Sequence, residues 1–299
     1  MNNYPCKLFD QLTLNTPLIL ASGVSGNSDS LLVRAARSGA AAVTTKGFTL
    51  KYRKGADNPV STDWGCGLIT NLGLTNPGVD SMKYMLSAYV EKAGDEAVPV
   101  FANIYADTAE EFAELTRKTA ALNPVLIEAD LPAPDENLAS EVTRAVCENA
   151  AGIPVSIKIS PDCCRISRLA EAIRDGGASA ITAVNPIPGM LIDAYAAKPF
   201  LSNGTGWISG PALKPIALNV IGELYQAVDL PIIGVGGVMS GLDMAEMLMA
   251  GARCVGVGSA LYYEGYSAFS RIMNEFSAFM ESEGYRDLDE IVGKIWWKS

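Results

Sequence analysis

The sequence of 299 residues contains no histidine. Histidine is the usual proton carrier near neutral pH and a frequent metal ligand. Its absence therefore excludes the Ser-His-Asp triad, the Cys-His pair and histidine-ligated metal sites. Any acid–base chemistry must use carboxylates, lysine, tyrosine, cysteine, hydroxyl groups or a bound cofactor.

The sequence also lacks a Cys-x-x-Cys pair, although it has six cysteines. Zinc sites and iron–sulfur clusters commonly take their thiolates from such closely spaced pairs, so we expect no metal centre. Scattered cysteines are typical of reduced thiols in a cytoplasmic protein. The six are Cys6, Cys66, Cys147, Cys163, Cys164 and Cys254.

Basic charge and long apolar runs are scarce as well. The net charge is −10 at pH 7, which argues against nucleic acids and anionic membranes as partners, because both need a basic face. No apolar run approaches the roughly 18 residues of a membrane span, and the opening MNNYPCKLFDQLTL lacks the layout of a signal peptide. With 49% hydrophobic residues, the chain is expected to be a cytoplasmic protein with a sizeable core that acts on a small molecule.

Short apolar runs rich in β-branched residues recur along the chain, as in buried parallel strands. Eight of them lie at 17–22, 41–46, 98–103, 124–130, 154–160, 180–185, 231–237 and 254–260. Segments with helical spacing separate most of them and predict helices near 28–39, 109–122, 138–150, 166–176, 211–227, 242–250 and 266–282. This alternation predicts an α/β fold, a (β/α)₈ TIM barrel in a single domain over 1–299, with an open doubly wound sheet as the alternative.

Polar residues and glycines stand where these strands end. Because the active sites of such barrels lie at the carboxyl ends of the strands, these residues are candidates for a common site. GVGG at 234–237 and GVGS at 256–259 end the last two strands, where backbone N–H groups commonly hold a phosphate. No Gly-x-Gly-x-x-Gly follows a strand, so we expect no dinucleotide bound in the Rossmann manner. The candidates are Ser22, Lys46, Asn103, Asp130, Lys158, Asn185, Gly236, Gly237, Gly258 and Ser259.

Two of these strand-end residues are lysines. Lys158 and Lys46 follow apolar residues, and a lysine buried in the barrel mouth needs an anionic partner. Either could form a Schiff base, as in aldolases, or donate to an electron-rich ring. A surface position is the simpler alternative for each.

With these residues placed, the chain resembles class 1 dihydroorotate dehydrogenases, and class 1B most nearly. The resemblance is carried in order by LILASG (18–23), VTTKGFTLKYRKG (43–55), NLGLTNPGVD (71–80), FANI (101–104), IKISPD (157–162), VNPIPGMLID (184–193), ISGPALKPIAL (208–218), IIGVGGV (232–238) and VGVGSALY (255–262). It implies an FMN-dependent barrel enzyme that passes electrons to a separate flavin and iron–sulfur subunit. We also expect a homodimer or larger assembly.

The resemblance assigns roles to individual residues. Lys158 would face the flavin ring and stabilise negative charge on the reduced cofactor. Substrate contacts would come from Lys46, Asn71, Gly73, Leu74 and Asn185. FMN would be held by Ala21, Ser22, Lys46, Asn103, Lys158, Gly210, Gly236, Gly237, Gly258 and Ser259, the last four at its phosphate.

The loop after the fourth strand departs from the family pattern Asn-Ile-Ser-Cys-Pro-Asn. Here it reads Asp130-Leu-Pro-Ala-Pro-Asp135, and Ala133 stands where the family has its cysteine base. Either the proton goes to Asp130, Asp135, Cys66 or a water they hold, or the substrate is a neutral or cationic molecule rather than dihydroorotate. A lysine-dependent aldolase and a non-catalytic flavin-binding relative are the remaining alternatives.

Overall fold

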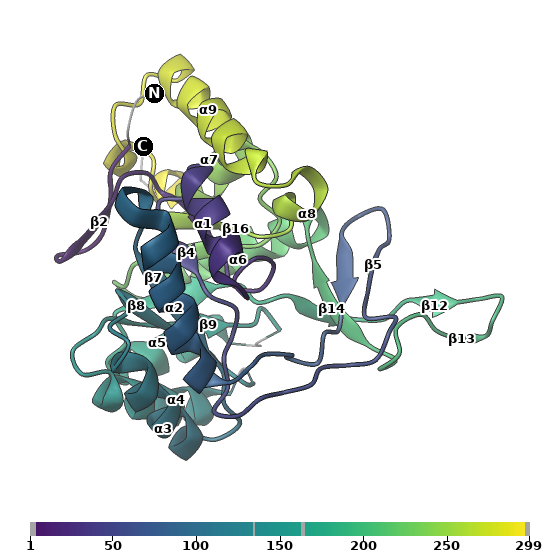
Figure 1. The fold of residues 1–299 in the computed structure, drawn as a ribbon. Coiled ribbons are helices and arrows are strands. Elements are labelled where there is room, and N and C mark those ends of the chain that lie inside the picture. Colours follow the sequence, from purple (N-terminus) through teal and green to yellow (C-terminus); the bar gives the residue numbers. More distant parts are fainter. Residues whose placement is uncertain (1–3, 134, 163–164, 297–299) are drawn as a thin grey trace.

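The computed structural model describes residues 4–133, 135–162 and 165–296 and contains a closed barrel of eight parallel strands (Figure 1). Each strand pairs with the next in sequence, and β16 pairs with β3 to close the ring. The predicted barrel is therefore confirmed, and the open doubly wound sheet is wrong. The strands are β3 (Leu18–Leu20), β4 (Val43–Thr44), β7 (Val100–Ile104), β8 (Leu126–Asp130), β9 (Val155–Ile159), β10 (Ala180–Ala183), β15 (Ile232–Val235) and β16 (Cys254–Val257).

Helices surround the barrel. Seven of them lie where the sequence predicts helices: α1 (Asp29–Arg37), α3 (Ala109–Ala120), α4 (Glu136–Asn149), α5 (Ile166–Asp175), α6 (Lys214–Ala227), α7 (Gly241–Ala250) and α9 (Ser267–Ser282). The predictions omitted α2 (Val79–Ala93) and the short α8 (Ala260–Glu264). Short 3₁₀ turns occupy Gly94–Glu96, Pro211–Leu213, Leu288–Glu290 and Lys294–Trp296.

Helix caps explain why some helices are easier to predict than others. Thr108 accepts a hydrogen bond from the Glu111 N–H at 3.2 Å and so caps α3, in the capping-box pattern that its sequence shows. Helix α2 begins after Gly78, which has no capping side chain. Its start therefore carries no sequence signal of this kind.

A second sheet covers part of the barrel mouth and was not predicted. It is antiparallel, in the order β11-β14-β6-β5, and combines β5 (Ser61–Asp63) and β6 (Leu68–Thr70) with β11 (Ile187–Gly189) and β14 (Gly206–Ser209). Beyond it a two-stranded arm of β12 (Ile192–Asp193) and β13 (Lys198–Pro199) projects from the body (Figure 1). A further hairpin pairs β1 (Cys6–Phe9) with β2 (Leu12–Leu14).

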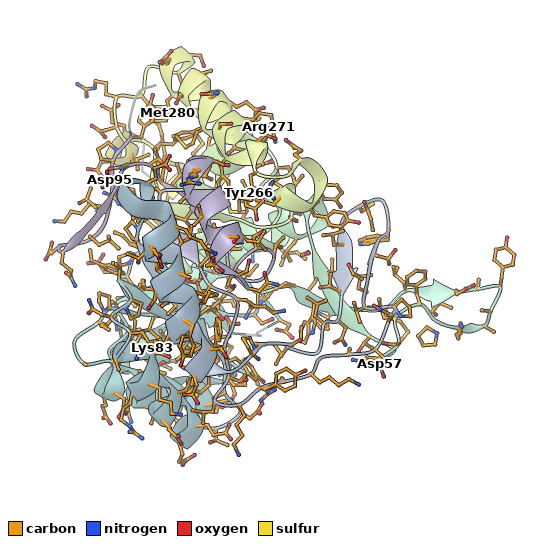
Figure 2. The ribbon with its side chains drawn as sticks, viewed as in Figure 1. Asp57, Lys83, Asp95, Tyr266, Arg271 and Met280 are labelled. Atoms are coloured by element: carbon orange, nitrogen blue, oxygen red, sulfur yellow. The ribbon has the colours of Figure 1, made fainter. Side chains whose placement is uncertain are left out.

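The C-terminal part of the chain contacts the loop that follows β3. Tyr266 lies between α8 and α9 (Figure 2). Its hydroxyl donates to Ser25 Oγ at 3.0 Å, and the guanidinium of Arg34 on α1 lies 4.6 Å from its ring centroid. These contacts hold the loop after β3 in place at the mouth of the barrel.

No helix within the described ranges is long and apolar enough to cross a membrane.

Candidate active site

Two adjoining cavities lie at the carboxyl ends of the barrel strands. The larger has a volume of about 560 Å³ and the smaller about 360 Å³, within the usual size range of small-molecule sites. Both are lined by Ser22, Gly23, Lys46, Thr70, Leu72, Lys158 and Pro186. The shared lining makes them two halves of one site at the position that the barrel fold favours.

The smaller cavity gathers nearly all the residues that the sequence assigns to a cofactor. Asn103 is the exception, because it lines the larger cavity instead. The nine in the smaller cavity are Ala21, Ser22, Lys46, Lys158, Gly210, Gly236, Gly237, Gly258 and Ser259. The structure thus brings together residues from six separate parts of the chain.

The glycines beside this cavity serve different purposes. Gly236 and Gly237 have φ of +131° and +76°, which favour glycine on backbone grounds alone. Gly258 has an ordinary φ, and a Cβ there would meet only Val24 Cγ2 at 3.7 Å and Ala21 Cβ at 3.9 Å. At each of the other glycines with an ordinary φ, a Cβ would stand closer than 3.0 Å to some atom. The fold therefore leaves room at Gly258 that a ligand can use.

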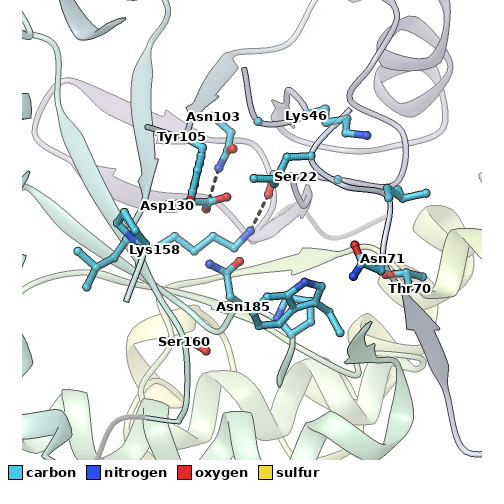
Figure 3. A pocket seen from close by; sticks show the side chains of 18 of the residues that line it. Ser22, Lys46, Thr70, Asn71, Asn103, Tyr105, Asp130, Lys158, Ser160 and Asn185 are labelled. Carbon is cyan, nitrogen blue, oxygen red and sulfur yellow. Dashed lines mark hydrogen bonds between the residues drawn. The ribbon is translucent and has the colours of Figure 1, made fainter. Parts of the chain in front are cut away.

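The Lys158 side chain crosses the barrel mouth (Figure 3). It comes from β9, it is 4% exposed, and its Nζ donates to Ser22 Oγ at 2.5 Å. Glu128 Oε1 lies 3.7 Å from the same nitrogen. The simpler prediction of a surface lysine is wrong here, and the buried ammonium has its anionic partner.

Lys46 is the second cation at the site. Its side chain is half-buried and lines both cavities, and burial lowers the pKa of its ammonium group. Within the described part of the chain, no carboxylate lies within ion-pair distance of Lys46. This arrangement leaves a positive charge available to an anionic ligand.

Three polar side chains form a cluster behind Lys158; Asn103 and Glu128 are buried, and Asp130 is half-buried. Asn103 Nδ2 donates to Glu128 Oε1 at 2.7 Å and to Asp130 Oδ1 at 3.1 Å. Burial raises the pKa of the Asp130 carboxyl; the Lys158 charge opposes this rise, and the Glu128 charge adds to it. One amide group therefore serves two carboxyl groups at the inner wall of the larger cavity.

The larger cavity contains every residue that the sequence assigns to substrate binding: Lys46, Asn71, Gly73, Leu74 and Asn185. Asn71 is partly used by the fold, because its Nδ2 donates to the Thr205 carbonyl at 2.8 Å and its Oδ1 accepts from the Gly73 N–H at 3.3 Å. Asn185 hydrogen-bonds to Asp130 and so lowers the pKa of that carboxyl. The two asparagines approach the cavity from different parts of the covering loops (Figure 3).

The structure separates the candidate proton acceptors. Asp130 lines the larger cavity, whereas Asp135 accepts a hydrogen bond from the Leu138 N–H at 2.9 Å and caps α4. Cys66 is exposed on the turn between β5 and β6. Neither Asp135 nor Cys66 lines either cavity. Ala133 is exposed, and residue 134 lies outside the described residues, as do Cys163 and Cys164.

Sequence reasoning missed several residues of the site. Glu128 could have been found, because it stands two residues before Asp130 and strand side chains alternate between faces. Tyr105 follows β7, and burial together with Asp107 raises the pKa of its phenol to about 12. Trp207 belongs to the unpredicted second sheet. The missed lining residues include Thr70, Tyr105, Leu131, Pro132, Ser160, Asp162 and Trp207.

Comparison with known proteins gives a consistent result. The family model described as dihydroorotate dehydrogenase matches residues 6–280. The catalytic subunit of dihydroorotate dehydrogenase B (NAD(+)) from Methanothermobacter thermautotrophicus is 39% identical over 295 residues, covering 94% of this chain and 95% of that protein. The subunit of the same name from Methanocaldococcus jannaschii is 38% identical over 297 residues, covering 94% of this chain and 95% of that protein.

The fold also has a counterpart among solved structures. A crystal structure of dihydroorotate dehydrogenase from Eimeria tenella in complex with ferulenol superposes with a TM-score of 0.86. It covers 99% of this chain and 89% of that one at 16% sequence identity. At this low identity the superposition supports the fold.

Within the described residues, no group of three or more cysteine, aspartate or glutamate side chains is placed to hold a metal ion.

Proposed function

Because this chain belongs to the dihydroorotate dehydrogenase family, we propose that it is an FMN-dependent oxidoreductase that oxidises the CH–CH bond of dihydroorotate to give orotate. The observation that carries this proposal is the pair of adjoining cavities. One contains nine of the ten predicted cofactor residues and the other the predicted substrate residues, and Lys158 lines both.

The residues of the smaller cavity fit FMN. The open space at Gly258 lies beside Ala21 and near the glycines that end β15, and backbone N–H groups there can hold a phosphate. Bound FMN would supply the hydride acceptor. The Lys158 ammonium would face the ring and stabilise negative charge that develops on it.

In the larger cavity the chain's own residues would orient the substrate. The Lys46 ammonium supplies the positive charge that a carboxylate substrate requires. Asn71 and Asn185 supply amide groups that can donate to or accept from a pyrimidine ring. Trp207, Leu72 and Leu74 add apolar surface and help to exclude water from the cavity.

Oxidation also releases a proton, and the methyl group of Ala133 cannot accept it. Of the acceptors considered, Asp130 is the one that lines the cavity. We propose that ionised Asp130, or a water it holds, takes this proton. Burial and the neighbouring Glu128 charge raise the pKa of Asp130. A raised pKa makes the ionised carboxylate a better proton acceptor.

A Schiff-base mechanism on Lys158 is not favoured. The Nζ atom is already engaged by Ser22 and lies next to Glu128, whereas a nucleophilic amine must be uncharged and free to attack. The names of the relatives do not favour an aldolase either.

The names of the relatives, catalytic subunits of an NAD(+)-linked enzyme, support a proposal about the electron acceptor. We propose that this chain passes electrons to a separate flavin and iron–sulfur subunit, because its sequence has neither a dinucleotide fingerprint nor a cysteine cluster. A homodimer or larger assembly stays a prediction that light scattering can check.

Two measurements on the purified chain test the function. Its visible spectrum should show bound flavin that is released as FMN on denaturation. Dihydroorotate added without oxygen should then bleach that spectrum. A colourless protein that does not take up added FMN would contradict the proposal.

A further inference from the structure

One buried cation faces two carboxyl groups in the barrel mouth. Glu128 and Asp130 stand two residues apart on β8, so they project from the same face of the strand. Asp130 is the register partner of Lys158 on the neighbouring β9. Lys158 Nζ lies 3.7 Å from Glu128 Oε1, and these side chains are 5% and 4% exposed. Lys158 and Glu128 therefore form a buried pair, and Asp130 is the additional acid.

The charge of this cluster favours a proton on Asp130. If both carboxyl groups were ionised, one negative charge would be left without compensation at a site that is largely shielded from water, which is unfavourable. Protonating one acid avoids that cost. Lys158 is engaged by Glu128, and burial raises the pKa of Asp130, so the proton belongs on Asp130.

The hydrogen bonds around Asn103 give an independent reason. Asn103 is fully buried, and its Oδ1 has no hydrogen-bond donor among the described residues. Turning the amide over would point Oδ1 at both carboxyl groups instead, so the orientation is fixed by Glu128 and Asp130. Asn103 Oδ1 and Asp130 Oδ2 both lie within 4 Å of the point where a Cβ on Gly47 would stand. A proton on Oδ2 would supply a donor on the side where Asn103 lacks one.

We propose that Asp130 meets the substrate as an uncharged carboxylic acid, and that its ionisation weakens the binding of a carboxylate-bearing substrate. This inference rests on the proposed function and specifies how the site accepts an anion. A protonated carboxyl group presents one acceptor and one donor, as an amide does, and it does not repel a carboxylate. Only the ionised form can accept the substrate's proton. Binding and proton abstraction therefore respond to pH in opposite directions.

Other ionisable groups face the same cavity and have to be separated from Asp130. Lys46 is the main one, because burial lowers its pKa and the loss of its charge would also weaken anion binding. Tyr105, with a pKa of about 12, stays uncharged up to strongly alkaline pH. Asp162 is exposed at the rim. An Asp130→Asn variant retains all of these groups and removes only the titration of Asp130.

The binding test uses orotate and the flavin-loaded protein. The dissociation constant of orotate is measured from the flavin spectrum between about pH 5 and about pH 9, a range that brackets raised carboxyl pKa values. In wild type this constant should stay the same at low pH, where Asp130 is protonated. Above the pKa of Asp130 it should rise toward about tenfold per pH unit, because the fraction of protein with protonated Asp130 falls by that factor. Asp130→Asn should bind without this rise. Asp135→Asn, the control at the cap of α4, should keep the wild-type profile.

The outcomes are distinct. A wild-type dissociation constant that stays flat over this range overturns the proposal, as does a rise of equal slope in Asp130→Asn, which would point to Lys46. Infrared difference spectra of wild type against Asp130→Asn should show the C=O band of a protonated carboxyl at neutral pH, and its absence also overturns the proposal. If no variant binds orotate at any pH, the proposed substrate is wrong, and the infrared band still decides the state of Asp130.

Discussion

Substituting Gly258 separates what the fold needs from what the cofactor needs. A Cβ at Gly258 would make only ordinary contacts, at 3.7 Å and beyond, and the φ there is ordinary. Gly258→Ala should therefore leave the stability of the flavin-free protein nearly unchanged, and Gly258→Val should extend further into the space we assign to the phosphate. Gly236→Ala is the contrasting variant, because its Cβ would meet Ala217 Cβ at 3.0 Å with φ at +131°.

The size of the effect follows from the hydrogen bonds lost. If the valine displaces the phosphate from two backbone N–H groups, each hydrogen bond to a charged group contributes about 1.5–3 kcal/mol. The loss is then about 3–6 kcal/mol, which corresponds to roughly 10²–10⁴-fold weaker FMN binding. Gly236→Ala should in addition destabilise the protein without FMN by about 1–3 kcal/mol through backbone strain.

The assay is a titration of the flavin-free protein with FMN, followed by fluorescence quenching, together with urea unfolding of each variant without FMN. We expect Gly258→Val to unfold like wild type and to lose FMN binding. Wild-type FMN affinity in Gly258→Val would refute the placement of the phosphate. A large loss of stability in Gly258→Ala would refute the claim that the fold leaves room at this position.

Four further predictions follow from the site. Lys158→Met should destabilise the protein by about 3–5 kcal/mol in urea unfolding, because Glu128 is left buried without a cationic partner; adding Glu128→Gln should restore much of this loss, and no restoration would contradict the pairing. Ala133→Cys alone should gain little dihydroorotate oxidation above the pKa of Asp130, where ionised Asp130 repels the substrate, since general-base catalysis worth about 10²–10⁴-fold also needs a pocket that accepts the substrate; the double variant with Asp130→Asn should bleach flavin much faster there, adding Asp135→Asn should change nothing further, and a double variant as slow as wild type would contradict this. The raised pKa of Asp130 means that its contribution to stability is present at low pH and is lost as pH rises through that pKa; the Tm of Asp130→Asn should therefore gain on wild type as pH increases, and a constant difference would argue against it. The isolated chain should oxidise NADH weakly or not at all, and rapid NADH-driven flavin reduction without a partner would overturn the proposed electron path.

The barrel could be predicted from the sequence because its signals are local. Each strand is a short apolar run, and several helices carry caps such as Thr108 on α3. Helix α2 begins at Gly78 without a side-chain cap, so that signal was missing. The second sheet pairs β6 with β14, which are more than 130 residues apart in the chain. No local pattern announces such a pairing.

The site was predictable to the extent that barrel strands place their ends together. Lys158, Asp130 and the strand-end glycines met at the mouth for this reason. Asp135 and Cys66 were proposed from their nearness in sequence to the loop or from their chemistry, but their positions depend on α4 and on the turn between β5 and β6. The partnership of Asn103 with two carboxyl groups depends on the register between β7 and β8, which sequence alone does not reveal.

The most direct test of the proposed function is anaerobic reduction of the bound flavin by dihydroorotate. We predict that the flavin absorbance of the wild-type protein decays to completion on addition of dihydroorotate, slowly because Ala133 cannot accept a proton and only the ionised form of Asp130 can, and that orotate appears in equal amount. Flavin that dithionite bleaches and that dihydroorotate leaves unchanged, at any pH at which the protein stays folded, would contradict the proposal.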